Sequence, residues 1–450
     1  MTPGNQPVQL KSSRARFPRL YLSYEQASEW QLTDVPDVRV EFGRNEFRAR
    51  LQQRAKTTGT CTLPVTNRPP VTRCTMGRTE RGVKIGPVVG VLTAKVDQKH
   101  RRPARYQLFS FGNLAKTAWA LGVILFVFTP DRVDWHRRKV TGLYYTPAQG
   151  WREAVFPLPD VIYNRVATRQ AERSRAVQDV ISRATEVPGL NLFNPCFLNK
   201  WDLYRALVAS PSTAPYLPET RLLTSQMGLR RFLRRYRYVY LKPVSSSLGK
   251  GVIRLEKSRG TVKVAYRLKG KNLVRRVSSW SELWATVQKR RVRLPYLMQK
   301  GIRLAVGQEP IFDVRTLVQR NQAGQWQVTG MGARVASTSG ITTHVPNGGS
   351  IASLVDILHR RRPHWPAREL LDQLHDLALR VPPALEAWYG HPFGEISLDI
   401  AVDIAGRLWV LEANAKPFKF DETTIYAESR CRLLQYCGYL AGLEPVAKGV

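Results

Sequence analysis

Alternating apolar and polar positions near the C-terminal end of the chain predict a β-hairpin. In residues 395–403 the apolar members are Ile396, Leu398, Ile400 and Val402, and the polar members are Glu395, Ser397, Asp399 and Asp403. Residues 408–414 predict the return strand, with residues 404–407 as the connection. In this register Asp399 lies opposite Glu412, and Asn414 shares the face of Glu412, because side chains alternate between the two faces of a strand.

The N-terminal half shows two different patterns. The first 80 residues carry short alternating stretches broken by Pro, Gly and Thr, and they predict a small β-rich module; residues 57–82, rich in Thr, Pro and Gly, predict a loop or linker. Residues 87–165 instead alternate an apolar strand at 87–94, a helix at 110–122 and a second apolar strand at 123–130. Such alternation predicts a parallel, Rossmann-like sheet. No GxGxxG motif follows the first strand, which disfavours a dinucleotide site.

The remainder of the chain mixes strand pairs with helices. We expect strands within 237–255, 257–279, 295–302, 312–319 and 326–335, and helices within 166–195, 198–236, 351–361, 367–388 and 424–443. A chain of 450 residues is too long for one compact core. The sequence therefore predicts an α+β protein with three regions, at residues 1–85, 86–195 and 196–450.

Composition excludes some classes of protein. No run of about 18 apolar residues occurs, so we expect no membrane-spanning helix. The N-terminus has no apolar core of a secretory signal. The five cysteines are scattered, without a CxxC pair, which is typical of reduced packing thiols in a cytoplasmic protein. The seven histidines form no recognisable metal-binding set.

The charge balance is extreme, with 70 Lys and Arg against 34 Asp and Glu, a formal net charge of +36. Such a charge favours a polyanionic partner: nucleic acid, anionic lipid or an acidic polymer. The basic residues are expected to be spread over the whole chain. A solvated basic surface that only tunes solubility is the alternative, because no zinc-finger spacing, RNP motif or helix-turn-helix signature is present.

The two opposed acids of the hairpin indicate a metal site. Carboxylates that face each other across a ladder repel, at a cost of roughly 0.2–1 kcal/mol. In a chain this basic, a hard cation between them is the economical explanation. Carboxylate and amide oxygens suit Mg²⁺, so Asp399, Glu412 and Asn414 are its candidate ligands. The alternative is a solvent-facing hairpin with chance acids.

Residues 238–252, YVYLKPVSSSLGKGV, predict a phosphate-covering flap. A strand delivers Lys242, and a loop of small and basic residues follows: Ser245, Ser246, Ser247, Gly249, Lys250 and Gly251. Small residues let backbone N–H groups approach phosphate oxygens closely. A second strand resumes at Val252, so the element is strand–loop–strand and differs from a P-loop. An ordinary glycine hairpin is the alternative.

Four other segments add polar groups. Lys200 begins a helix, a position that opposes the helix dipole unless an anion lies in front of it. Asp313 and Arg315 alternate on one strand, and Arg334 follows. An Arg can bind an anionic oxygen with two hydrogen bonds, although a lone strand Arg is more often an ion-pair partner. An Asn-Gly-Gly turn occupies 347–349.

The order of these motifs resembles the ATP-grasp superfamily, and within it the chain is similar to the YheC/YheD group of endospore coat-associated proteins. The matching segments are FLNKWDLY at 197–204, KPVSSSLGKG at 242–251, IFDVRTLVQRNQAGQW at 311–326 and DIAVDIAGRLWVLEANAKP at 399–417. The resemblance covers residues 87–440. It implies an α+β ATP-grasp fold with a Rossmann-like pre-ATP-grasp domain, preceded by the small β-rich module.

The resemblance also implies roles for residues. Lys200 and Lys242 would contact the adenine edge and the α-phosphate, and the flap at 245–251 would cover the β- and γ-phosphates of ATP. Residues 298–302, with Gln299, Lys300 and Gly301, would be the hinge that reads adenine. Asp399, Glu412 and Asn414 would hold Mg²⁺, and Arg315 and Arg334 would lie near the γ-phosphate and the acyl group. Gln299 stands where many such enzymes have an acid, which leaves Glu309 as the candidate ribose-binding residue.

Members of the superfamily typically activate a carboxylate as an acyl phosphate that an amine or thiol then attacks. The resemblance therefore implies an ATP- and Mg²⁺-dependent carboxylate–amine or carboxylate–thiol ligase linked to bacterial sporulation, cytoplasmic or associated with the spore. The alternative is a basic structural protein of the spore coat, or a polyanion-binding protein, that binds ATP without turnover.

Overall fold

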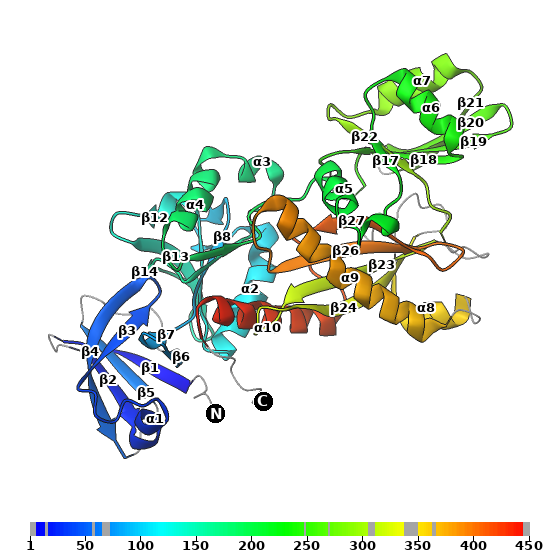
Figure 1. Cartoon of the computed structure of the whole chain (residues 1–450). Helices are drawn as coiled ribbons and strands as arrows, with labels where there is room; N and C mark the ends of the chain where they lie inside the picture. The colour runs from blue at the N-terminus through cyan, green and yellow to red at the C-terminus, as the bar shows by residue number, and fades with distance from the viewer. Residues whose placement is uncertain are drawn as a thin grey trace.

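A computed structural model of the chain describes residues 6–13, 17–55, 59–64, 73–246, 249–268, 271–304, 311–336, 350–361 and 366–443. Within these residues the strands form a closed barrel, a mixed sheet, two antiparallel sheets and one two-stranded ribbon (Figure 1). No helix of the described part is long and apolar enough to cross a membrane.

The N-terminal module is a closed barrel. Its strands, in spatial order, are β1 (Gln6–Ser13), β5 (Gly59–Pro64), β2 (Arg19–Ser23), β4 (Asn45–Arg54), β3 (Asp37–Phe42), β7 (Gly82–Ile85) and β6 (Arg73–Thr79), with the short helix α1 (Tyr24–Glu29) after β2. The predicted loop at 57–82 is wrong, because β5 and β6 lie within it. Cys61, Cys74 and Met76 are buried inside the barrel, so the apolar side chains among the threonines fill its core.

The second sheet has a parallel centre, as the sequence predicts. Its strands are β8 (Val88–Leu92), β11 (Ile124–Phe128), β12 (Val133–Asp134), β13 (Lys139–Thr146), β14 (Gly150–Pro157), β15 (Val161–Asn164) and β16 (Asn191–Phe193). The order β11-β8-β15-β16 is parallel throughout. Helix α2 (Arg105–Ala120) connects β8 to β11 and begins five residues before the predicted helix; α3 (Arg169–Glu172) and α4 (Arg175–Glu186) connect β15 to β16. The two-stranded ribbon, β9 (Val96–Asp97) with β10 (Arg102–Pro103), precedes α2.

Alternate side chains of β8 pack into two different hydrophobic clusters. Val88 and Leu92 belong to the cluster that also contains the barrel interior, whereas Val89 and Val91 pack with α2 and the C-terminal helix α10 (Thr423–Leu440). The barrel and one face of the parallel sheet thus share one hydrophobic cluster. The division of the chain at residues 85 and 195 stays a prediction, because it concerns which segments fold independently.

The first antiparallel sheet has the order β17 (Thr220–Leu222), β22 (Tyr296–Lys300), β18 (Tyr238–Pro243), β19 (Ile253–Ser258), β20 (Thr261–Leu268) and β21 (Lys271–Val277). Helices α6 (Gln226–Arg235) and α7 (Trp280–Arg290) cover one of its faces with a separate apolar cluster. The opposite face carries Tyr240 and Lys242 of β18. The expected strand–loop–strand unit is confirmed as β18 and β19.

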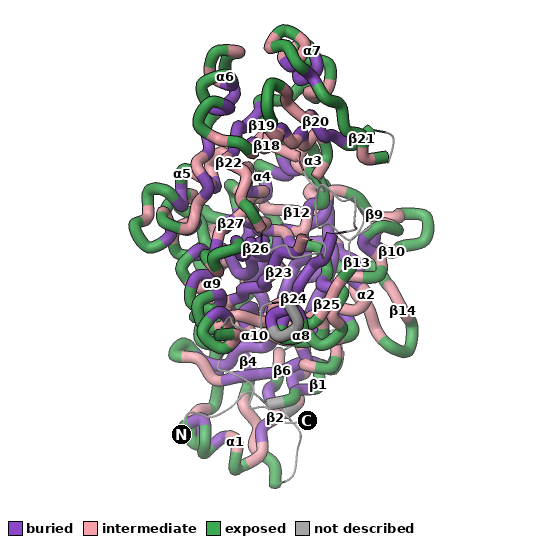
Figure 2. Tube along the Cα trace, turned by 90° about the vertical axis from the view of Figure 1, so that its right-hand side faces the viewer, coloured by how far each residue is buried: buried purple, intermediate pink, exposed green. Residues whose placement is uncertain are grey.

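The second antiparallel sheet has the order β25 (Ser350–Ala352), β24 (Trp326–Val335), β23 (Phe312–Arg320), β26 (Glu395–Val402) and β27 (Leu408–Asn414). Its apolar face packs against α5 (Lys200–Val208), α8 (Leu354–Arg361) and α9 (Ala367–Tyr389). Strand β26 is buried along its whole length (Figure 2). The alternative of a solvent-facing hairpin is therefore wrong: Asp399 is only 4% exposed, because the polar face of β26 is covered as well.

Candidate functional site

Eight of the predicted site residues line a cleft between the two antiparallel sheets. It has an empty volume of about 890 Å³, including its open mouth. Its walls come from β18 and β22 on one side and from β23, β26 and β27 on the other, with the start of α5 at one end (Figure 1). The cleft is lined by Lys200, Tyr240, Lys242, Ser246, Gly249, Val252, Gln299, Lys300, Ile302, Leu304, Ile311, Asp313, Asp399, Leu411 and Glu412.

Lys200 connects three parts of the cleft. Asn199 caps α5 by accepting hydrogen bonds from the backbone N–H groups of Trp201 and Asp202, which places Lys200 at the first helical position. The Lys200 Nζ donates to the backbone oxygen of Ser246 at 2.8 Å and lies 3.2 Å from Glu412 Oε1. One ammonium group therefore joins the helix start, the flap and the acidic hairpin.

Lys242 lies on the opposite wall, where Gln299 holds it. Its Nζ donates to Gln299 Oε1 at 2.6 Å, and Gln299 Nε2 donates to Thr220 Oγ1 at 3.0 Å. Burial lowers the pKa of Lys242 to about 8, although the nearby Glu412 favours the charged form; Lys200 adds to the lowering. This lysine changes its charge close to neutral pH, unlike an exposed lysine.

The two acids of the hairpin lie where the sequence predicts them. Asp399 pairs with Glu412 across β26 and β27, and Ser397 pairs with Asn414 in the next row on the same face. A register shift follows Asp399, so that Leu411 has no partner in the ladder. The predicted register is confirmed. Asp399 and Glu412 both line the cleft.

Each of these acids is already close to a cation of the chain. Arg334 Nη2 lies 2.7 Å from Asp399 Oδ2, and the same guanidinium donates two 3.0 Å hydrogen bonds to Asp313. Burial alone would lower the pKa of Arg334, but the carboxylates of Asp399 and Asp313 outweigh it and raise that pKa. Glu412 is paired with Lys200. Repulsion between the acids is thus relieved without a metal, which removes the electrostatic argument for one.

The donor chemistry still fits Mg²⁺. Two carboxylates and an amide share one face of the β26–β27 pair, and such oxygen ligands are the ones that Mg²⁺ prefers. Within the described residues there is no group of three or more His, Cys, Asp and Glu side chains that could hold a metal. Asp399, Glu412 and Asn414 stay the candidate ligands from the sequence; Asp399 and Glu412 line the cleft, whereas Asn414 does not.

Arg315 lies on β23, which pairs with β26 on the side away from β27. It is directly opposite Asp399 in that pairing. Its Nη2 donates to the backbone oxygen of Phe418 at 3.4 Å, and its guanidinium lies 5.0 Å from the centre of the Phe420 ring. Neither Arg315 nor Arg334 is among the residues that line the cleft. Both flank it on the polar face of the sheet.

The flap contributes less to the cleft wall than its sequence indicates. Ser246 and Gly249 line the cleft, whereas Ser245, Lys250 and Gly251 do not, and Ser247 lies outside the described residues. Gly251 has φ +77°, and a Cβ there would approach Tyr296 OH and Pro243 Cγ to 2.9 Å. Gly301 likewise packs against Tyr238, so both glycines permit close packing. The Asn-Gly-Gly turn at 347–349 and Glu309 lie outside the described residues.

The apolar part of the cleft is what sequence reasoning missed. Tyr240, Val252, Leu304, Ile311 and Leu411 all line it. Tyr240 could have been found, because it precedes Lys242 by two residues on one strand and so shares its face. The others come from segments whose meeting depends on the packing of two sheets.

Comparison with known proteins identifies the family. The profile of the YheC/D like ATP-grasp family matches residues 189–440, which is more than half of the chain. The chain belongs to this family. The predicted family and the α+β ATP-grasp fold are thereby confirmed.

Relatives share most of the length of this ATP-grasp protein. The endospore coat-associated protein YheD of Bacillus subtilis (strain 168) is 29% identical over 367 residues, 80% of each chain. The endospore coat-associated protein YheC of the same strain is 27% identical over 342 residues, 75% of this chain and 93% of YheC. Among solved structures, the VanG D-Ala:D-Ser ligase of Enterococcus faecalis aligns with 80% of this chain and 99% of its own, with 12% identity and a TM-score of 0.46. The last likeness carries no argument about substrate.

Proposed function

We propose that this ATP-grasp protein is an ATP- and Mg²⁺-dependent ligase that joins a carboxylate to an amine or a thiol. One observation carries the proposal: Lys200, Lys242, Asp399 and Glu412 come from four separate elements and meet in one cleft between two sheets. Two cations for phosphate oxygens and two acids for a metal are the groups that a metal–nucleotide complex needs.

The walls of the cleft divide into a polar and an apolar part. Tyr240, Ile302 and Leu411 offer flat or apolar surface for the adenine ring. The backbone around Gln299, Lys300 and Gly301 would hold its edge. Lys200 and Lys242 would neutralise phosphate oxygens, and Ser246 and Gly249 of the flap would cover them, with Ser245, Ser247, Lys250 and Gly251 completing the flap.

Asp399, Glu412 and Asn414 would hold Mg²⁺, which supplies charge neutralisation and a fixed position for the phosphates. The two arginines take different roles. Arg334 would fix Asp399 through their ion pair, acting through the acid. Arg315, opposite Asp399, would hold an oxygen of the γ-phosphate or of the acyl group.

The reaction needs no protein nucleophile. A substrate carboxylate oxygen attacks the γ-phosphorus, the bond to the β–γ bridging oxygen breaks, and ADP leaves. The amine nitrogen or thiol sulfur then attacks the carbonyl carbon of the acyl phosphate, and the C–O bond to phosphate breaks. Phosphate leaves with the bonding electrons, and the proton of the nucleophile goes to solvent. Positioning and charge neutralisation by Lys200, Lys242 and Arg315 would supply the chain's share of the acceleration.

Nucleotide binding is tested by thermal unfolding with and without Mg-ATP. A ligand at about 100-fold over its Kd adds about 2.7 kcal/mol of stability, so we expect a clear rise in melting temperature. Pools of amino acids and carboxylates, scored by ATP-dependent phosphate release, then test turnover. An unchanged melting temperature at millimolar Mg-ATP would contradict the proposal.

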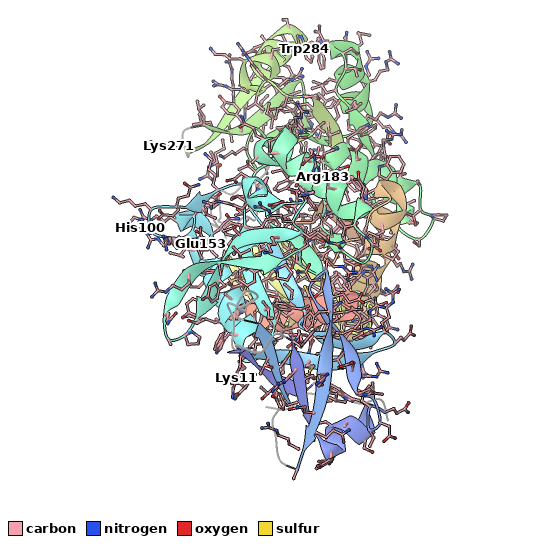
Figure 3. All side chains as sticks on the ribbon, turned by 90° about the vertical axis from the view of Figure 1, so that its left-hand side faces the viewer. Lys11, His100, Glu153, Arg183, Lys271 and Trp284 are labelled. Carbon is pink, nitrogen blue, oxygen red and sulfur yellow. The ribbon has the colours of Figure 1, made fainter. Side chains whose placement is uncertain are left out.

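A second function is favoured by where the positive charge lies. Residues 219–300 hold 22 Lys and Arg and three Asp and Glu, so this segment carries 19 of the 36 excess charges. The other 48 Lys and Arg are spread over the rest of the chain, as expected, but the excess over acids is concentrated in this segment. The six-stranded sheet and its two helices form this basic region, and Lys271 lies at its outer edge on β21 (Figure 3). We propose that the region binds a polyanion, such as an acidic polymer of the spore, consistent with the names of YheD and YheC.

A further inference from the structure

A second cavity lies on the polar face of β23 and β26, between α2 and the C-terminal helix α10. Its empty volume is about 560 Å³. Its lining comes from α2, the end of β15, β23, β26, residues 417–420 and α10. None of the candidate nucleotide-binding or metal-binding residues lines it.

The second cavity is a direct neighbour of the acidic hairpin. Leu317 in its floor lies two residues from Arg315 on β23, about 7 Å along the strand. Arg315 is opposite Asp399, and Glu395 in the same floor precedes Asp399 by four residues on β26. Arg315 Nη2 donates to the backbone oxygen of Phe418, which lines the second cavity, so Arg315 links this lining to the row of Asp399. The second cavity and Asp399 therefore lie along the same polar face of β23 and β26.

The charge of the second cavity is positive. Arg165 immediately follows β15, at the carboxyl edge of the parallel sheet, where ligands of such sheets bind. Both of its terminal nitrogens donate to the backbone oxygen of Pro417 at 3.2 Å, and it lies 3.5 Å from Glu395. Lys419 and Arg430 add two further cations; Lys419 lies 3.9 Å from Asp421, and Arg430 donates to Thr117 Oγ1 and to the backbone oxygen of Tyr426. Glu395 is the one acid of the lining, and it already accepts hydrogen bonds from Tyr163 and Gln319.

One polar group in the wall has no partner. The hydroxyl of Tyr426 is buried and makes no hydrogen bond to the rest of the described structure. Arg430 stacks on the ring of the same tyrosine, with 4.4 Å from its guanidinium carbon to the ring centre. Buried hydroxyls nearly always have a partner, so this one points to a ligand that accepts a hydrogen bond.

Aromatic rings complete the lining. Phe111, Phe420 and Tyr163 lie in the wall, and Phe418 at the rim is 74% exposed. Isolated exposed apolar side chains are common, but this one borders a cationic cavity beside the metal-ligand candidates. An anionic group next to an apolar or aromatic body would satisfy the cations, the hydroxyl and the rings together.

We propose that the second cavity binds the acceptor substrate, an amino acid whose side chain is apolar or aromatic, through its unreacting carboxylate. This rests on the ligase function proposed above. The carboxylate lies among Arg165, Arg430 and the Tyr426 hydroxyl, and the side chain packs against Phe418 and Phe420. The amine then points past Arg315 toward Asp399, where the acyl phosphate forms.

Binding of matched probes to the full chain tests the cavity directly. L-Phenylalanine, L-leucine and L-alanine are each titrated against their carboxamides in the presence of Mg²⁺ and a non-hydrolysable ATP analogue, by calorimetry. We expect at least one amino acid to bind tenfold or more tightly than its amide. The inference is overturned if no amino acid binds better than its amide.

Tyr426→Phe removes only a hydroxyl that has no partner among the described residues, so its effect isolates ligand binding. We expect it to weaken amino-acid binding about fivefold or more, with the melting temperature and the affinity for Mg-ATP unchanged. Tyr439→Phe, on the same helix but outside the lining, is the matched control and is expected to bind like the wild type. Equal binding by the Tyr426→Phe variant and the wild type would contradict amino-acid binding in the second cavity.

Turnover separates this inference from the proposed ligase. If amino acids bind but no carboxylate releases phosphate from ATP, the ligase fails and the cavity stands. If turnover occurs and Tyr426→Phe leaves the acceptor KM unchanged, the ligase function is supported and acceptor binding in the second cavity is contradicted. With both correct, Tyr426→Phe raises the KM for the acceptor and leaves the KM for ATP unchanged.

Discussion

Asp399 and Glu412 lie directly opposite each other on β26 and β27, and a different cation of the chain pairs with each. The partner of Asp399 is Arg334, whose side chain is 4% exposed, whereas the partner of Glu412 is Lys200 at 12%. Arg334 also holds Asp313, while the Lys200 ammonium also donates to a backbone oxygen of the flap. We therefore expect the first pair to be structural and the second to be exchanged for a metal and a phosphate when these bind.

Glu412→Gln is expected to abolish Mg²⁺-dependent nucleotide turnover and to leave the melting temperature without ligand within a few degrees of the wild type. The substitution removes a candidate metal ligand but keeps the shape of the side chain, and Lys200 retains its bond to Ser246. Phosphate release and thermal unfolding measure the two effects. Glu428→Gln, which changes an exposed acid of α10, is the control. Turnover at the wild-type rate would show that the hairpin is not the metal site.

Arg334→Met is expected to lower the free energy of unfolding by roughly 3–5 kcal/mol, because it leaves Asp313 and Asp399 buried without their shared cation. Denaturant unfolding measures the change. Arg407→Met is the matched control: Arg407 also pairs with an Asp, yet its side chain is 70% exposed, so its loss should cost about 1 kcal/mol or less. Equal effects of the two substitutions would contradict a structural role for Arg334.

The acidic hairpin was predictable because its register depends on local features. A two-residue period and a short connection fix which side chains face each other, and Asp399 lies opposite Glu412 as expected. The burial of both faces of β26 depends on remote elements, namely α9 and the segments that cover the polar face. Sequence pattern alone could not show it.

Two features that the sequence did not predict, the barrel strands within residues 57–82 and the pairing of Arg334 with Asp399, also depend on remote elements. Residues 57–82 read as a loop, because Thr and Pro obscure the alternation that buries Cys61 and Met76, and the barrel closes by pairing β1 with β6. The pairing of Arg334 with Asp399 joins side chains from two strands that are not neighbours, with β23 between them. Such contacts follow from sheet order, which no local pattern encodes.

Lys242 is expected to make ATP binding take up a proton above pH 8. Burial holds its pKa near 8 in the free protein, and a polyphosphate beside it would raise that pKa. At pH 8.5 binding then adds a proton to Lys242, and affinity falls as the pH rises; at pH 6.5 the lysine is already charged, and it contributes no uptake. Calorimetry of Mg-ATP binding in buffers of different ionisation enthalpy measures the proton. In Lys242→Arg the side chain stays charged, and persistent uptake at pH 8.5 in that variant would assign the proton elsewhere.

The charge excess of residues 219–300 is expected to drive binding to polyanions that weakens steeply with salt and ignores sequence. Each contacting charge that releases a counterion contributes about −0.9 to the slope of log K against log salt on duplex DNA. Arg259, Lys271 and Arg276 are exposed on β20, β21 and their connections, so replacing all three with Gln should flatten the slope by up to about 2.7 if each contacts the DNA. The same replacement of Arg48, Arg50 and Arg73, exposed on the barrel, should change it by less than half as much. Salt titrations with two DNA duplexes of unrelated sequence make the measurement. Salt-insensitive binding, preference for one duplex, or equal effects of the two triple variants would contradict a polyanion surface on the six-stranded sheet.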